Sequence, residues 1–448
     1  MTRYVILGTG VAAISAAEEI RVYDPGGEIH LIGDDPFGYY SRPGLAYYLT
    51  GELGEEMLYP YRKQDFLKLN LRFYRGRAAR ILPAEKQVEL DNGARLPYDK
   101  LLIATGAQAM PLKIPGANVK GIHKLDHLAD ARALLAEAKR GRTAIVTGGG
   151  ITALELAEGL AARGMKVHYV FRSPRYWPGV LDETESGIIE SLLEREGIIL
   201  HRKSEIVEIL AKHGRVHAAR LADGRTLKAN LLAYAIGIAP RVDLAREAGL
   251  ACERGILVNE YLQTSQPDIF AAGDAAQVFD PASGKYLLDS LWNPAREQGR
   301  AAARNMTGRT EPYRKPPVFN VTRLAGLTVT IIGAVAPPGR GVRGEGEAEG
   351  DLDLVGIARG DSETWRELPH SIIAQSGFEV NRLRLMVGEK HLFGAIVMGD
   401  QKLSGPLQSL IREQTDITPI RAQLLAPNAP IADILAAFVS RNGKQVYR

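Results

Sequence analysis

Two short glycine-rich turns, each directly after an apolar run that predicts a β-strand, constrain the fold more than any other feature of this chain. The first turn runs from Gly8 to Ala13, and the second runs from Gly148 to Ala153. In such a turn one glycine allows the sharp bend, the next lets the backbone approach a pyrophosphate, and the small third residue lets the following helix pack closely. The N-terminus of that helix favours negative charge. Two copies about 140 residues apart predict two dinucleotide sites and electron transfer between them.

Composition narrows the classes of partner. A chain of 448 residues is long enough for two or three domains. The formal net charge is only +4 and no long basic run stands out, so nucleic acid is not expected as a partner. Cys252 is the only cysteine, which excludes an intrachain disulfide, an iron–sulfur cluster and an all-cysteine zinc site. The histidines are scattered, and no metal site is expected.

The sequence also allows an expectation about the cellular compartment of the protein. It contains no run of about 18 consecutive apolar residues, so no membrane-spanning helix is expected. The N-terminus enters a strand at once, without the charged start and apolar core of a secretion signal. We therefore expect a cytoplasmic protein.

The order of predicted elements gives the fold class. Strands alternate with helices over most of the chain, which predicts an α/β protein with two Rossmann-like dinucleotide-binding domains, one inserted in the other, plus a C-terminal α+β domain. A Pro/Gly-rich crossing at residues 111–121 and a second crossing at Ala239-Pro240 mark the boundaries. The predicted domains are 1–110 with 240–312, 111–239, and 313–448.

Four motifs in this order resemble the pyridine nucleotide-disulfide reductase superfamily of flavoproteins. They are the first glycine turn, the segment Ala104-Thr105-Gly106, the second glycine turn continuing to Glu155, and the pair Gly273-Asp274. The resemblance is strong over residues 1–310 and loose over 311–448. It implies that the first turn holds FAD, that the second holds NAD(P)H, and that Asp274 holds the ribityl or phosphate region of the flavin.

The resemblance names two sets of candidate binding residues. The FAD set is Gly8, Gly10, Ala13, Asp34, Arg42, Ala79, Ala104, Thr105, Gly106, Gly273 and Asp274. The NAD(P)H set is Gly148, Gly150, Ala153, Glu155, Arg172 and Gly237. The ribose of FAD needs a carboxylate after the second strand. Asp34 is preferred to Asp35 because it comes first after that strand, although either could be an ordinary surface acid.

The segment from Tyr40 to Leu45 resembles the ferredoxin-reductase-like branch of the superfamily, which includes rubredoxin reductases and the FAD part of assimilatory nitrite reductases. An arginine at the position of Arg42 can lie near the isoalloxazine ring or the FAD phosphates. Two residues depart from related patterns. Tyr47 stands where the branch often has lysine, and Pro43 stands where coenzyme A disulfide reductases have a reactive cysteine. Thiol chemistry needs a thiolate, so it is not expected here.

No residue is assigned a certain catalytic role. The candidates for lying near the flavin are Arg42, Pro43, Tyr47 and Trp292. Trp292 opens a helix that resembles the one pointing at the flavin ring in the superfamily, but packing in the core would explain it equally well.

The coenzyme site departs from the NADH-specific pattern. The strand and turn over residues 167–175 contain no acid, whereas NADH-specific members usually have glutamate there. Arg172 or Arg175 could instead pair with a 2′-phosphate, which favours NADPH. Two alternatives stay open: both arginines are solvated and the enzyme is indifferent, or the site no longer binds a nicotinamide.

The resemblance implies an FAD-dependent NAD(P)H oxidoreductase that passes electrons from nicotinamide through flavin to a small redox protein or a partner subunit, without a redox-active disulfide. The run from Leu392 to Asp400 resembles the nitrite-reductase-like branch, in which the C-terminal domain often dimerises, so a homodimer is expected. Two other functions stay open. One is a peripheral membrane NAD(P)H:quinone dehydrogenase, suggested faintly by the amphipathic run from Ile431 to Val439, for which docking on its own domain is the preferred interpretation. The other is a non-catalytic FAD-binding protein.

Overall fold

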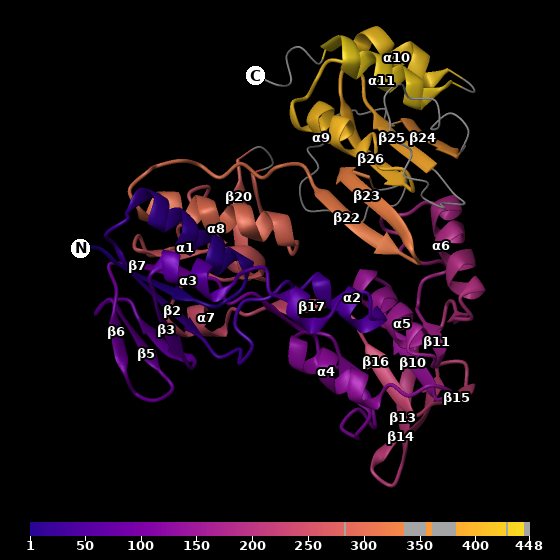
Figure 1. Ribbon diagram of the computed structural model, residues 1–448, viewed down its shortest axis with the longest axis horizontal. Coiled ribbons are helices and arrows are strands. Elements are labelled where there is room, and N and C mark those ends of the chain that lie inside the picture. Colours follow the sequence, from indigo (N-terminus) through magenta and orange to yellow (C-terminus); the bar gives the residue numbers. More distant parts are fainter. Residues whose placement is uncertain (282–283, 336–354, 361–381, 427–428, 443–448) are drawn as a thin grey trace. The chain divides into compact units, whose positions relative to one another are not determined.

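The computed structural model describes residues 1–281, 284–335, 355–360, 382–426 and 429–442. They form two compact units (Figure 1). The first unit holds residues 1–173 and 196–315. The second holds residues 174–195 together with the described residues from 316 onward.

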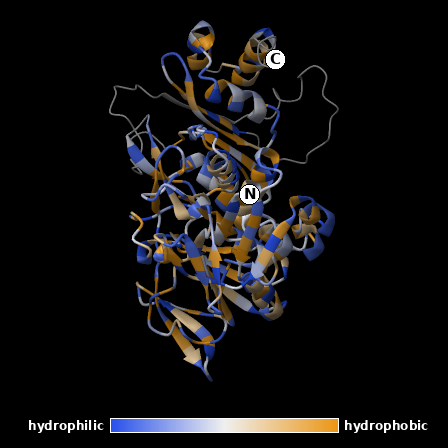
Figure 2. Cartoon of the chain, turned by 90° about the vertical axis from the view of Figure 1, so that its left-hand side faces the viewer, coloured by the Kyte–Doolittle hydropathy of each residue, from blue (hydrophilic) through white to orange (hydrophobic). Residues whose placement is uncertain are grey.

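A five-stranded parallel sheet forms the centre of the first half of unit 1. Its order is β3 (Leu71–Arg75), β2 (Glu28–Gly33), β1 (Arg3–Leu7), β7 (Lys100–Ile103) and β19 (Ile269–Ala271). Parallel strands covered on both faces read as continuous apolar runs, and β1 and β7 are of this kind. Figure 2 colours the chain by hydropathy, and hydrophobic residues are visible on many of its strands and helices. The last strand arrives almost 170 residues after β7, since the other dinucleotide fold lies between them in the sequence.

The second half of unit 1 repeats this plan. Its parallel sheet has the order β12 (Ile199–His201), β11 (Lys166–Val170), β10 (Thr143–Thr147), β16 (Leu231–Tyr234) and β9 (Ile122–Lys124). Helices α4 (Leu128–Glu137) and α5 (Ile151–Ala162) accompany it. The predicted α/β class with two Rossmann-like folds, one inserted in the other, is therefore confirmed. In the described parts of the chain, no helix is both long and apolar enough to cross a lipid bilayer.

Smaller elements complete unit 1. One antiparallel sheet holds β4 (Ala78–Leu82), β5 (Gln87–Leu90) and β6 (Arg95–Pro97), and a second holds β13 (Ile206–Lys212), β14 (Arg215–Leu221) and β15 (Thr226–Lys228). In a third sheet, β20 (Ala276–Asp280) pairs with β21 (Lys285–Leu288) antiparallel and with β18 (Ile256–Val258) in parallel. The pair β8 (Ala107–Ala109) and β17 (Ile238–Pro240) lies where the chain passes between the two halves. The short helices are α2 (Gly44–Thr50), η1 (Glu55–Leu58), α3 (Lys63–Leu69), α7 (Asp243–Glu247) and η2 (Gly273–Ala275).

Unit 2 is built on an antiparallel sheet. Its order is β22 (Phe319–Leu324), β23 (Leu327–Gly333), β26 (Leu392–Met398), β25 (Arg382–Val387) and β24 (Val355–Gly360). Helices α9 (Ser404–Arg412), α10 (Thr418–Leu425) and α11 (Ile431–Asn442) share a core with one face of it. Ile431, Leu435 and Phe438 of α11 are buried in that core, as expected for a helix docked on its own domain.

Helix α6 (Glu183–Arg195) also belongs to unit 2, although the sequence places it between β11 and β12 of the coenzyme-type sheet. The three domain ranges predicted from the sequence follow the order of the chain and stay a prediction.

Helices α1 (Val11–Tyr23) and α8 (Trp292–Met306) lie side by side in unit 1 (Figure 1). Small residues allow this contact, because Gly299 of α8 faces the backbone of Ala12. A Cβ atom on Gly299 would collide with the carbonyl oxygen of Ala12. This contact joins the turn before α1 to the helix that follows the Gly273-Asp274 motif.

The contact predicts a stability difference between two helical glycines. Gly299→Ala should lower the free energy of unfolding by about 1–3 kcal/mol, because the methyl group must displace backbone. Gly187→Ala in α6 is the matched control: nothing lies within 4 Å of its Cβ position, so alanine should stabilise the protein by about 0.5–1 kcal/mol. Urea denaturation of both variants measures this. If Gly299→Ala and Gly187→Ala have the same free energy of unfolding, α1 and α8 separate easily enough to admit the methyl group.

Candidate functional site

The first glycine turn joins β1 to α1 and is built for close approach. Gly8 has φ +117°, and a Cβ there would collide with the carbonyl oxygen of Ala104. Its N–H donates to the carbonyl of Ile32 at 2.8 Å, which fixes the turn against β2. Gly10 is the N-cap residue of α1, and nothing lies within 4 Å of its Cβ position. The backbone is therefore open where a pyrophosphate would approach the helix N-terminus.

The second turn, between β10 and α5, reproduces these features. Gly148 has φ +146°, and a Cβ there would collide with the carbonyl oxygen of Ala235. Its N–H donates to Val170 at 3.2 Å, and nothing lies within 4 Å of the Cβ position of Gly150. The residues that approach the two turns are themselves equivalent, since Ala104 follows β7 and Ala235 follows β16.

Two aspartates follow β2, and they have different surroundings. The side chain of Asp34 is 60% exposed and pairs with Arg77 at 3.2 Å. The side chain of Asp35 is 13% exposed, accepts a hydrogen bond from the N–H of Phe37 at 2.9 Å and lies 3.6 Å from His127. Burial would raise the pKa of Asp35, but these partners outweigh it and the pKa is lowered. Asp34 is thus the more accessible carboxylate for a ribose and remains the predicted one.

Arg42 belongs to a cluster that no sequence motif marked. Its Nη2 lies 3.2 Å from Nδ1 of His127, and Nη2 of Arg241 lies 3.2 Å from Nε2 of the same ring. Arg241 is anchored on the Ala104–Gly106 segment: its N–H donates to Gly106 at 2.9 Å and its Nη1 donates to the carbonyl of Thr105 at 3.1 Å. The only signal in the sequence was the place of Arg241 directly after the crossing at Pro240.

Asp274 lies in η2, which follows β19. Burial raises the pKa of this carboxyl to about 6, the charge of Arg42 opposes the shift, and Asp289 adds to it. The neighbouring Gly273 has φ +74°, and its N–H donates to Oε1 of Gln298 at 2.8 Å. A partly buried carboxyl with cations nearby is suited to accept a hydrogen bond from a ligand hydroxyl.

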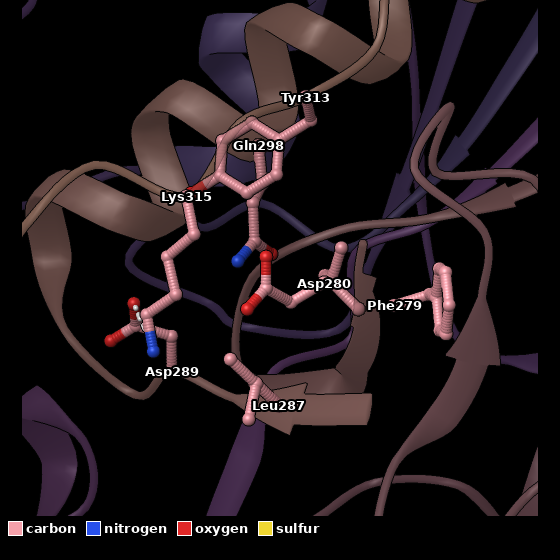
Figure 3. Close-up of a pocket in the computed structure, with 8 residues that line it drawn as sticks. Phe279, Asp280, Leu287, Asp289, Gln298, Tyr313 and Lys315 are labelled. Atoms are coloured by element: carbon pink, nitrogen blue, oxygen red, sulfur yellow. Dashed lines mark ion pairs between the residues drawn. The ribbon is translucent and has the colours of Figure 1, made fainter. Parts of the chain in front are cut away.

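Gln298, which binds the N–H of Gly273, also lines a small pocket (Figure 3). Lys315 extends beside Asp289 in this view, and the two charged groups pair at 3.6 Å. Burial raises the pKa of Asp289, and Lys315 opposes that shift. The lining residues are Val278, Phe279, Asp280, Leu287, Asp289, Gln298, Tyr313 and Lys315.

The candidates for lying near the flavin are spread over three elements. Pro43 is exposed at the N-cap of α2, and Tyr47 lies within that helix. The ring of Trp292 stacks on Tyr39, with centroids 6.2 Å apart and an interplanar angle of 14°. Ala79 is exposed on β4. Their roles toward FAD stay predictions.

Helix α2 connects the two halves of unit 1. It packs on α5, where a Cβ on Gly159 would lie 2.7 Å from the Cβ of Leu49. Glu155 belongs to α5, and burial together with the charge of Glu158 raises its pKa to about 7. Four candidates of the NAD(P)H set thus lie just before or within α5, whereas Gly237 lies after β16. The four are Gly148, Gly150, Ala153 and Glu155.

The two arginines expected near a 2′-phosphate are placed differently. Arg172 is 79% exposed, and its nearest acid, Glu205, is 3.7 Å away. Arg175 lies in unit 2, where its Nη2 donates to the carbonyl of Leu181 at 3.4 Å. Phe171 is buried and meets Tyr169 edge to face. Of the predicted pair, Arg172 is therefore the residue with an accessible charge.

These observations fit FAD in the first site. There is no room for a side chain at Gly8, open space at Gly10, and a partly buried carboxyl at Asp274 on which the charge of Arg42 acts. Comparison with known proteins agrees, because residues 2–299 match the pyridine nucleotide-disulphide oxidoreductase family. The chain belongs to this family. It is an oxidoreductase that uses FAD and NAD(P)H, as the motifs predicted.

Many known proteins are similar to the chain, and two relatives and one solved structure illustrate this. The assimilatory nitrate reductase electron transfer subunit of Bacillus subtilis (strain 168) is 30% identical over 95% of this chain, which spans only 51% of that protein. The biphenyl dioxygenase system ferredoxin–NAD(+) reductase component of Paraburkholderia xenovorans (strain LB400) is 33% identical over 79% of this chain and 87% of its own length. The covalent putidaredoxin reductase–putidaredoxin complex contains a chain with a TM-score of 0.82 and 23% identity, covering 97% of this chain and 98% of that one, a likeness of fold.

The raised pKa of Asp274 predicts how stability of the FAD-free protein depends on pH. The folded protein holds this proton up to about pH 6, whereas the unfolded chain releases it near the ordinary pKa of 3.8. The folded state binds more protons in this window, so stability falls as the pH rises through it. Asp274→Asn should remove this dependence and raise the free energy of unfolding by on the order of 1–3 kcal/mol above pH 6.

Urea denaturation of the wild type and of Asp274→Asn, each without FAD, measures the difference at several pH values. It should shrink to nothing below about pH 4, where the carboxyl is protonated in both states. A difference that does not change with pH would contradict the assignment to this carboxyl.

Proposed function

We propose that this protein passes electrons from NAD(P)H through FAD to a small redox protein or a partner electron-transfer subunit, without a redox-active disulfide. The observation that carries this proposal is the repeated glycine turn, found at equivalent strands of two parallel sheets within one unit. The names of the relatives support the acceptor class, since one is an electron transfer subunit and the other a ferredoxin reductase component.

The residues of the chain bind and orient in this proposal. FAD, when bound, supplies the chemistry of accepting a hydride and releasing electrons. The N-terminus of α1 provides positive charge for a diphosphate, and Arg42 and Arg241, whose charges act on Asp274, are further cations for such a group. Asp274 accepts a hydrogen bond from a ligand hydroxyl. The N-terminus of α5 does for the coenzyme diphosphate what α1 does for the flavin nucleotide.

A thiol relay has no support in the chain. Pro43 stands at the position where a reactive cysteine would be expected, and the only cysteine, Cys252, has its pKa raised by burial. A thiol with a raised pKa stays protonated at neutral pH and is a poor nucleophile. Electrons therefore pass from the flavin to the acceptor directly.

NADPH is the coenzyme we propose to be preferred. Residues 171–175, directly after β11, include no acid, and the exposed Arg172 is available to a 2′-phosphate. A cytoplasmic homodimer, with residues 313–448 at the interface, completes the proposal. Light scattering and cell fractionation test the assembly and the compartment.

Anaerobic reduction of the purified protein tests the proposed function. The protein should be yellow, release FAD on acid treatment, and lose its flavin absorbance when NADPH or NADH is added. Reduced protein should then transfer electrons to a ferredoxin or rubredoxin added in excess. A flavin that neither coenzyme bleaches would favour a non-catalytic FAD protein, and transfer to quinone alone would favour a membrane dehydrogenase.

The FAD site predicts a contrast between two aspartates. Asp274→Ala should lose most of its flavin during purification, because the carboxyl proposed to accept a hydrogen bond from the ligand is removed. Asp243→Ala is the control, since that side chain is 82% exposed on α7. Flavin content per chain, read from the absorbance spectrum, measures both. Equal retention would show that Asp274 does not hold FAD.

The coenzyme preference predicts a selective effect at Arg172. Arg172→Ala should weaken NADPH binding by roughly ten- to a hundredfold and leave NADH binding unchanged, because a charge-assisted pair with phosphate is worth about 1.5–3 kcal/mol. Stopped-flow titration of flavin reduction measures both affinities. Arg195→Ala, an exposed residue at the end of α6, serves as a control. A wild type that binds NADH more tightly would overturn the preference.

A further inference from the structure

Two arginines are buried in unit 2. Arg382 and Arg384 lie on β25 and are only 8% and 4% exposed. Their partners are Asp182 and Glu185 at the start of α6, and Glu185 is fully buried. Alternate residues of β25 point to opposite faces. Leu383, Leu385 and Val387 join the core with α9, α10 and α11, so the arginines occupy the other face.

Arg384 uses its whole guanidinium in this cluster. Its Nε donates to Oε1 of Glu185 at 2.8 Å, its Nη2 donates to the carbonyl of Val180 at 2.6 Å, and its Nη1 donates to the carbonyl of Val335 at 3.1 Å. Arg382 donates to Oδ2 of Asp182 at 2.9 Å. A planar fork with several fixed acceptors holds its partners in one geometry.

The same two carboxylates also cap α6. The N–H of Asp182 donates to Oε2 of Glu185 at 2.9 Å, and the N–H of Glu185 donates to Oδ1 of Asp182 at 2.8 Å, in a reciprocal capping arrangement. Farther along, the N–H of Tyr176 donates to Glu190 at 2.6 Å, and Ser186 donates to the carbonyl of Tyr176 at 2.7 Å. The segment 174–195 is thus held to β25 and also tied to itself.

A buried ion cluster of this kind is weak evidence for stability, because desolvation of the charges offsets their attraction. The cluster instead holds the segment 174–195 against β25 in one defined geometry. The segment that it fixes is also distinctive in the sequence. The chain enters it directly from the end of β11, after Ser173, and returns to unit 1 at Glu196 before β12.

The residues at that entry are the ones assigned above to the adenosine end of the coenzyme. Residues 171–173 are held by backbone hydrogen bonds to His201, Lys203 and Ser204, so the part of the entry left to be fixed is residues 174 and 175. We propose that Arg384, with Arg382, is a positioning residue for NAD(P)H: by fixing the segment 174–195 it sets the backbone of residues 174 and 175 and so the affinity for the coenzyme. The inference rests on the proposed function. The chemical step is unaffected, because neither arginine acts on the reacting atoms.

Titration of the full-length, FAD-loaded protein with NADPH and NADH tests the inference. In Arg384→Gln the apparent Kd of the coenzyme should rise by at least about fivefold, the lower range of coupling between sites. The limiting rate of flavin reduction and the FAD content should not change. Arg384→Lys keeps the charge but loses the planar guanidinium, so its apparent Kd for the coenzyme should lie between those of the wild type and of Arg384→Gln. Arg412→Gln is the matched control, because that arginine is exposed on α9 and pairs with its neighbour Glu413.

Hydrogen exchange gives a readout that does not depend on activity. Amides of residues 175–181 should exchange faster in Arg384→Gln than in the wild type, without any coenzyme present. If that variant fails to fold, Arg384→Met/Glu185→Gln replaces it, since removal of both charges avoids an unpaired buried ion and the glutamine can still cap α6.

The outcomes separate the inference from the proposed function. A wild type whose flavin is not reduced by either coenzyme overturns the proposed function. A wild type that is reduced, with folded variants whose Kd and exchange are unchanged, overturns the inference alone. Loss of affinity, limiting rate and FAD content together would show a general structural role and would also overturn it.

Discussion

The close approach of two backbone segments at each glycine turn is the constraint on which the dinucleotide folds depend. Gly8 and Gly148 both have positive φ, and each is so near the carbonyl of an alanine after another strand that no side chain fits. The contact brings the carboxyl ends of β1 and β7, or of β10 and β16, against the start of a helix. The same lack of space that fixes the turn leaves the next glycine open to a ligand. Packing and binding therefore arise from one local geometry.

The two sites share that geometry but differ in charge. Around the first turn, Arg42 and Arg241 both contact His127. The charges of both arginines also oppose the rise in the pKa of Asp274. Around the second turn, the accessible cation is Arg172, which is mostly solvated. Partly buried charges are screened much less than exposed ones. This contrast suits a nucleotide that stays bound at the first site and a coenzyme that comes and goes at the second.

Features that depend on a few consecutive residues could be predicted from the sequence. The glycine turns, the Gly273-Asp274 motif and the two parallel sheets are of this kind, because strand, turn and helix start are adjacent in the chain. The cluster of Arg42, His127 and Arg241 could not be predicted, since its members come from segments far apart and meet only in the folded chain. The preference for Asp34 over Asp35 rested on its place directly after β2, and the difference in exposure between the two side chains appears only in the folded chain.

Strand β25 shows why the membership of α6 in unit 2 could not be predicted from the sequence. Its alternation of arginine with leucine is typical of a strand with one face in water, yet both arginines are buried. Arginine can be buried when its donors find fixed acceptors, and here the carboxylates that cap α6 serve as those acceptors. A helix that local sequence assigns to one sheet is thereby stabilised against another. The residues between β11 and β12 that form α6 therefore belong to unit 2, although the sequence places them within the second dinucleotide fold, and their acceptors bind arginines about 200 positions farther along the chain.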